Sequence, residues 1–127
     1  MRSVVLALVL TSIFVSHLWA APPVHVWSQR HGGTSADEGT SVAVDGAGNV
    51  FVTGSFFGTA NFGGANLVSA GNADIFIAKY DAIGAHLWSK RVGGSSGDRA
   101  IVLAIDPSGN IIVTGQFGAT VDLAAGR

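Results

Sequence analysis

The sequence predicts an all-β fold built from short antiparallel strands, and three observations support this. Glycine supplies 18 of the 127 residues, about twice its usual share of roughly 7%, so many tight turns are expected. No segment after residue 21 combines a sustained 3.6-residue apolar period with helix caps. The chain also repeats itself at a fixed interval of 61 residues.

The repeat is evident when residues 27–66 are compared, without a gap, with residues 88–127. Of these 40 aligned pairs, 16 are identical. The identical pairs are Trp27/Trp88, Ser28/Ser89, Arg30/Arg91, Gly32/Gly93, Gly33/Gly94, Ser35/Ser96, Asp37/Asp98, Ala43/Ala104, Asp45/Asp106, Gly48/Gly109, Asn49/Asn110, Val52/Val113, Thr53/Thr114, Gly54/Gly115, Phe56/Phe117 and Thr59/Thr120. A fixed period of this length is typical of propellers, solenoids and repeat arrays.

One period is expected to hold four short strands. They are Val42–Asp45, Asn49–Phe56, Ile75–Tyr80 and His86–Val92, rich in β-branched and aromatic residues and bounded by glycine turns. Residues 58–72, rich in Gly, Asn and Ser, are expected to be irregular, and a further strand is expected to begin at Val24. Four antiparallel strands per repeat describe one blade of a β-propeller. We therefore predict an all-β chain of antiparallel four-stranded propeller blades, present as an incomplete piece.

The first twenty residues are expected to be a signal peptide. Arg2 gives a short positive start, Val4–Val15 is apolar apart from Thr11 and Ser12, and cleavage is expected after Ala20. The alternative is an uncleaved membrane anchor, because residues 3–21 have about the length that a bilayer needs. Both alternatives predict a secreted or cell-surface protein. Residues 21–127 then form the partial propeller, with repeat 1 at about 27–87 and a truncated repeat 2 at about 88–127, about 1.75 periods in all.

Composition excludes several classes of function. The chain has 7 Lys and Arg against 8 Asp and Glu, a net charge of −1, and no basic run, which argues against a nucleic-acid partner. It has no cysteine, so disulfides, thiolate metal sites and catalytic thiols are excluded. No dinucleotide-binding fingerprint occurs, and no cofactor is expected.

The repeated motifs resemble the bacterial seven-bladed β-propeller repeat, SBBP. The resemblance lies in Trp27–Gly33, Val44–Phe56, Phe62-Gly63-Gly64 and Asp74–Asp81, and it begins again at Trp88. It implies an exported or cell-surface bacterial protein with many tandem copies. Because one repeat cannot bury its own faces, we expect this chain to be a fragment that needs further blades, in cis or in trans.

Two repeated motifs offer candidate sites. The Asp-x-x-Gly-Asn turns, with Asp45 and Asn49 and then Asp106 and Asn110, carry oxygen ligands of the kind that calcium takes. Two side chains per turn are few for Ca²⁺, so the favoured interpretation is a turn capped by Asp, with Gly48 and Gly109 at positive φ.

The other candidate site residues are repeated in both copies, so a ligand could contact the equivalent residue of several blades. Asp37 and Asp98 end the Gly-Gly-x-Ser-x-Asp loops and are expected at one rim. Trp27 and Trp88 occupy equivalent positions and are expected either to stack on a sugar or to seal one blade against the next.

No set of residues predicts catalysis. Asp37 and Glu38 are adjacent carboxylates, but Arg99 replaces Glu38 in the second copy. We therefore interpret the chain as a structural or ligand-binding scaffold with an unidentified protein or glycan partner. The alternative is part of a propeller-based secreted hydrolase or oxidoreductase whose catalytic residues lie outside this chain. A membrane is expected as a partner only through an uncleaved signal segment.

Overall fold

A computed structural model describes residues 24–121, and this part of the chain is made of strands joined by turns and loops. The strands are β1 (Gly32–Gly33), β2 (Asp37–Val44), β3 (Val50–Asn61), β4 (Asn66–Tyr80), β5 (His86–Val92), β6 (Asp98–Ile105) and β7 (Ile111–Phe117). The predicted signal peptide, residues 1–20, lies outside the described residues. Within them, no helix is long and apolar enough to cross a membrane.

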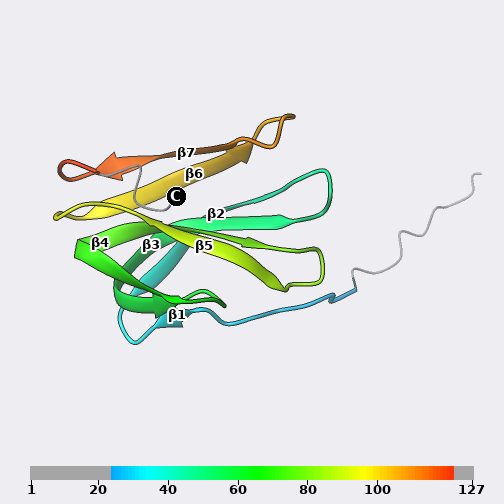
Figure 1. The fold of residues 1–127 in the computed structure, drawn as a ribbon, viewed down its shortest axis with the longest axis horizontal. Helices are drawn as coiled ribbons and strands as arrows, with labels where there is room; N and C mark the ends of the chain where they lie inside the picture. The colour runs from blue at the N-terminus through cyan, green and yellow to red at the C-terminus, as the bar shows by residue number, and fades with distance from the viewer. Residues whose placement is uncertain (1–23, 122–127) are drawn as a thin grey trace, which may run out of the picture.

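The strands form one blade and the first half of another. β2, β3, β4 and β5 follow one another as an antiparallel sheet, here called blade 1, and the short β1 pairs with the far end of β3. β6 and β7 form a separate antiparallel pair, here called blade 2, which lies against β2, β3 and β4 (Figure 1). β6 has the bounds of β2 displaced by 61 residues. The predicted fold of antiparallel propeller blades is therefore confirmed.

Residues 58–72 form strands except at 62–65, so the expected irregular stretch was wrong. β3 runs on to Asn61 and β4 begins at Asn66, which makes a long hairpin with a register shift between Phe57 and Thr59. The side chain of Asn61 donates to Asn66 Oδ1 at 2.8 Å across the turn. The amino-acid composition suggests a loop here because Gly, Asn and Ser favour turns. The strands form nevertheless because β3 and β4 hydrogen-bond to each other, and composition does not predict which strands pair.

A strand at Val24 was also expected, and residues 24–31 carry none. They follow the surface of blade 1: Gln29 donates its side-chain amide to the carbonyl oxygen of Gly84 at 2.8 Å. A strand requires a neighbouring strand to hydrogen-bond with, and no described strand pairs with this segment.

The two faces of each blade have different neighbours. Successive side chains of a strand point to opposite faces, so Ser41, Phe51 and Thr53 share one face of blade 1, here called the back face. Phe51 is 3% exposed and Thr53 is fully buried, and the Ser41 hydroxyl accepts a hydrogen bond from the Leu103 amide at 3.1 Å. The back face of blade 1 therefore packs against blade 2.

The opposite face of blade 1, here called the front face, carries Val42, Val44 and Val52 together with a buried aromatic cluster. In that cluster Phe62 stacks on Phe76 with ring centroids 4.0 Å apart. Leu103, the blade 2 residue equivalent to Val42, is only 5% exposed. Blade 2 thus presents its front face to the back face of blade 1.

The glycine of the repeated Val-Thr-Gly motif is explained by a close approach of two backbones. A Cβ atom at Gly54 would overlap the carbonyl oxygen of Glu38, and one at Gly115 would overlap that of Arg99. Both glycines lie where the first strand of the blade carries a bulge. A side chain at either glycine would push the first two strands of its blade apart.

Replacement of Gly48 by valine is expected to destabilise the chain much more than Ala47→Val. Gly48 has a φ of +83°, which confirms the predicted left-handed turn position. A β-branched residue in that conformation costs about 2 kcal/mol, whereas Ala47 is exposed and its replacement should change stability by roughly 0.5 kcal/mol or less. Urea unfolding of the two variants measures the difference. Equal midpoints would contradict the turn assignment.

Candidate functional site

The Asp-x-x-Gly turns are closed by their own aspartates. Asp45 Oδ1 accepts hydrogen bonds from the amides of Ala47 and Asn49, both at 2.9 Å, and Oδ2 accepts one from the Asn49 side chain at 2.7 Å. Asp106 makes the same three bonds in blade 2, with Ser108 and Asn110 as donors. The four calcium candidates thus form two hydrogen-bonded pairs, each held within one turn.

A third turn of this kind joins β4 and β5. Asp81 Oδ1 accepts the amides of Ile83 and Ala85 at 3.0 and 2.8 Å, and Gly84 has a φ of +88°. A glycine turn was expected between these two strands, but not its likeness to the other two turns. The shared Asp-x-x-Gly spacing was the signal.

These hydrogen bonds favour the charged form of the capping carboxylates. The side chain of Asn49 lowers the pKa of Asp45 from its ordinary value of 3.8, with further lowering by the turn amides and by Lys79, although partial burial opposes this. Asn110 lowers the pKa of Asp106 in the same way. Both aspartates therefore act as ionised turn caps.

Asp37 and Asp98 hold the loops that lead into each blade. Asp37 Oδ2 accepts the amide of Gly33, and Asp98 Oδ2 accepts the amide of Gly94, both at 2.7 Å. Asp98 is 1% exposed, and its second oxygen accepts the amide of Gly118 at 3.0 Å. The carboxylate of Asp98 is thus fully engaged by backbone donors.

The two tryptophans lie against other rings of the fold. Trp88 meets the edge of Phe51 at a centroid distance of 6.1 Å. Trp27 lies 6.1 Å from Tyr80 and close to Gly84. The phenol of Tyr80 donates to the carbonyl oxygen of Phe62 at 2.8 Å, and burial raises its pKa to about 12.

His31 also stacks on Tyr80. Its ring lies 5.0 Å from that of Tyr80. Burial lowers the pKa of His31, and the nearby His86 lowers it further. Nε2 of the same ring lies 3.0 Å from Oε1 of Gln29.

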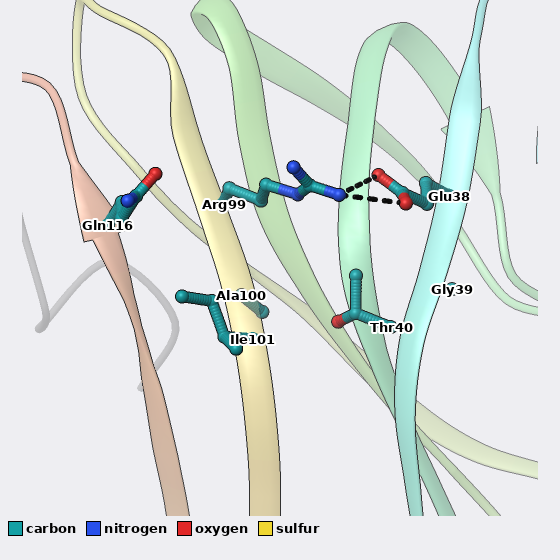
Figure 2. A pocket seen from close by; sticks show the side chains of 7 residues that line it. All are labelled: Glu38, Gly39, Thr40, Arg99, Ala100, Ile101 and Gln116. Atoms are coloured by element: carbon teal, nitrogen blue, oxygen red, sulfur yellow. Dashed lines mark hydrogen bonds and ion pairs between the residues drawn. The ribbon is translucent and has the colours of Figure 1, made fainter.

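A groove of about 480 Å³ opens between the first strands of the two blades. Seven residues line it: Glu38, Gly39 and Thr40 from β2, Arg99, Ala100 and Ile101 from β6, and Gln116 from β7 (Figure 2). Arg99 Nη2 lies 2.9 Å from each carboxylate oxygen of Glu38 and so bridges the groove.

The Glu38–Arg99 pair is exposed and contributes little to stability. The side chains are 57% and 55% exposed, and such surface pairs are worth about 0–1 kcal/mol. Both groups therefore remain able to exchange their mutual contact for contacts with a ligand. Carboxylate, guanidinium, hydroxyl and amide groups together offer donors and acceptors along one groove.

Several groove residues differ between the two copies of the repeat, although the strands that carry them hold equivalent positions. Glu38 corresponds to Arg99, Thr40 to Ile101 and Ser55 to Gln116, at the offset of 61. The aspartates and glycines of the Asp-x-x-Gly turn motif are identical in the two copies, whereas the exposed groove residues Glu38, Arg99 and Gln116 differ from their counterparts. From the sequence alone, the replacement of Glu38 by Arg99 in the second copy argues only against paired carboxylates. Their ion pair requires the packing of two blades.

No cluster of three or more His, Asp or Glu side chains suited to a metal ion occurs in residues 24–121. The groove itself holds one carboxylate and one guanidinium. Its chemistry is that of polar recognition by hydrogen bonds and charge.

Comparison with known proteins agrees with the architecture. Residues 26–55 match the family model of the SBBP beta-propeller repeat. The chain is also similar to an uncharacterized WD repeat-containing protein of Acanthamoeba polyphaga mimivirus, with 26% identity over 110 residues, covering 72% of this chain and 8% of that protein. The chain therefore spans less than a tenth of this relative's length. No solved structure matches it.

Replacement of Asn49 by alanine is expected to raise the pKa of Asp45 towards 3.8, because the side-chain donor that lowers it most is lost. Since the folded pKa lies below the unfolded one, the stabilisation from this turn is present above about pH 4 and is lost as the pH falls through the folded value. Carboxyl NMR titration of Asp45 measures the shift. Asp106 serves as the internal control and should titrate unchanged; an unshifted Asp45 would contradict the assigned cause.

Proposed function

Because the chain carries a repeat of the SBBP beta-propeller family, we propose that it is part of an exported propeller scaffold that binds a partner in the groove between its blades. The observation that carries this proposal is the exposed Glu38–Arg99 pair, which spans the groove at 2.9 Å. The two side chains of this pair carry opposite charges and are exposed. They differ although they hold the same position in the two copies of the repeat.

The chemistry of the groove favours a polypeptide segment as the partner. Among its lining residues, Thr40 and Gln116 can bond to backbone amides and carbonyls, and Glu38 and Arg99 can pair with charged side chains. A sugar ring usually stacks on an aromatic side chain, and the seven lining residues include no aromatic ring. A glycan partner is the competing outcome.

Export is the second part of the proposal and rests on the sequence of residues 1–20. A short positive start, an apolar stretch and Ala20 before Ala21-Pro22-Pro23 are the parts of a secretory signal. The family resemblance supports a place outside the cytoplasm, at the surface or in the medium. In an oxidising compartment this cysteine-free chain would be held by packing without disulfides.

The proposed scaffold includes more blades than the described residues contain. Propellers contain about four to eight blades, and repeat units bury their faces only against neighbours. The match to a small part of a much longer WD repeat-containing protein is in keeping with this. The described strands then serve as two adjacent blades of the scaffold.

Exchange of the two charges, E38R with R99E, is expected to abolish partner binding while leaving stability within roughly 0.5 kcal/mol, because the ion pair is retained with reversed polarity. A photo-crosslinker at Thr40 in the full chain, applied to intact source cells, captures the partner. Loss of about tenfold or more of the captured peptide in the exchanged variant supports the proposal. Capture that is unchanged, or that yields glycan, contradicts it.

Fusion of residues 1–30 to an alkaline phosphatase that is active only outside the cytoplasm is expected to give enzyme activity. A matched fusion with Leu8→Arg, which breaks the apolar stretch, should lose it. N-terminal sequencing of the exported product distinguishes cleavage after Ala20 from an uncleaved anchor. Equal activity of the two fusions would contradict export by this segment.

A further inference from the structure

The front face of blade 1 carries a hollow of about 250 Å³ that the proposed function does not use. Four aromatic side chains form much of its wall: Trp27, Phe62, Phe76 and Tyr80. The ring of Trp27 is partly exposed and lies 6.1 Å from that of Tyr80. Pockets for drug-sized ligands usually hold about 300–1,000 Å³, so this smaller hollow suits a single long side chain.

A carboxylate oxygen without a donor belongs to the same hollow. Asp37 lines it and accepts the amide of Gly33 with Oδ2 at 2.7 Å, whereas its Oδ1 is buried and accepts no hydrogen bond from residues 24–121. In the second copy, the equivalent Oδ1 of Asp98 accepts the amide of Gly118 at 3.0 Å. A buried carboxylate oxygen that lacks a donor is unfavourable, so a ligand that brings one gains a strong hydrogen bond.

The lining of the hollow is acidic. It includes the carboxylates of Asp37 and Glu38 and no Lys or Arg. Glu38 is already paired with Arg99, whereas Asp37 forms no ion pair within the described part of the chain. His31, which also lines the hollow, supplies no positive charge at neutral pH because burial lowers its pKa from the ordinary value of 6.5.

The second copy of the repeat shows an ammonium group beside the equivalent tryptophan. There, Lys90 Nζ lies over the ring of Trp88, 5.9 Å from its centre, which is a favourable cation–π contact. In the first copy, Gln29 holds the position of Lys90, and no Lys or Arg among residues 24–121 lies over the ring of Trp27. The ring of Trp27 is therefore available to a cation that the described chain does not supply.

We propose that this hollow binds the side chain of a lysine from a partner polypeptide. The apolar part of the lysine lies against the aromatic wall, its ammonium group is attracted by the ring of Trp27, and one ammonium N–H donates to Asp37 Oδ1. A lysine is the occupant of choice because Lys90 of this chain makes the same contact with Trp88. The unpartnered oxygen requires an N–H donor, which a quaternary ammonium group lacks.

This site goes beyond the proposed groove and can fail separately from it. Glu38 and Gly39 line both openings, whereas Trp27, Gln29 and Asp37 line the hollow and not the groove. Changes at these three residues therefore test the lysine site, and the exchange of Glu38 with Arg99 tests the groove.

Titration of the full chain with N-acetyl-lysine methylamide, followed by the indole N–H signals in NMR spectra, measures the binding. The signal of Trp27, assigned by its loss in Trp27→Phe, is expected to shift saturably. The signal of Trp88, which already has Lys90 over its ring, should stay unchanged and is the internal control. The norleucine derivative lacks the ammonium group and the trimethyl-lysine derivative lacks the N–H donors, so each should bind about tenfold more weakly.

Two variants test the assigned contacts. Asp37→Asn is expected to weaken lysine binding about tenfold or more, because a neutral amide replaces the charged acceptor. Gln29→Lys introduces the residue of the second copy and should weaken binding similarly, because its own ammonium group competes for the ring of Trp27. Asp106→Asn removes a carboxylate from a turn of blade 2 that does not line the hollow, and this matched control should bind normally.

Four results would overturn the proposal. The first is a Trp27 signal that does not shift in a chain whose spectrum shows dispersed β-sheet amides. The second is equal binding of the norleucine or trimethyl-lysine derivative, which would assign the hollow to an apolar or a quaternary ammonium ligand. The third is lysine binding that Asp37→Asn leaves unchanged. The fourth is tighter binding of a methyl glucoside, which would assign the aromatic wall to a sugar.

Discussion

The described fold depends on the burial of the back face of blade 1 against the front face of blade 2. Phe51 and Thr53 are buried because Leu103 and its blade lie on them, and Leu103 is buried by the same contact. Burial of one such side chain contributes roughly 1.5–3 kcal/mol, which exceeds what the exposed Glu38–Arg99 ion pair supplies. Apolar packing between blades therefore determines the fold. The exposed charges of Glu38 and Arg99 are not needed for it.

Close packing of strands also explains most of the identities within the repeat. Gly54 and Gly115 allow the backbone of the first strand to approach the second, and Gly48 and Gly109 take positive φ in the turns. The capping aspartates close the same turns with ionised carboxylates, whose pKa values the turn donors lower. Identity between copies marks residues that build a blade, which is why repeated candidates are found in turns, loops and interblade packing.

Residues that differ between the copies are, by contrast, not required for building the blade. Glu38 and Arg99 share one structural position, and each copy uses it with a different charge. The two residues meet only because successive blades place their first strands side by side (Figure 2). A repeat protein can thus form an asymmetric polar site from an otherwise uniform frame, without altering the residues that hold the frame together.

The sequence by itself determined the all-β class, the period of 61, the turn glycines and the position of β5, because alternation, β-propensity and Asp-x-x-Gly spacing are local properties. The long hairpin of β3 and β4, the unpaired course of residues 24–31 and the groove at Glu38 were decided by the tertiary structure. Each depends on which strand or blade lies opposite, and contacts between residues far apart in the chain leave no local signal. The propeller blade was predictable from the repeat, whereas the site between blades emerged only from their packing.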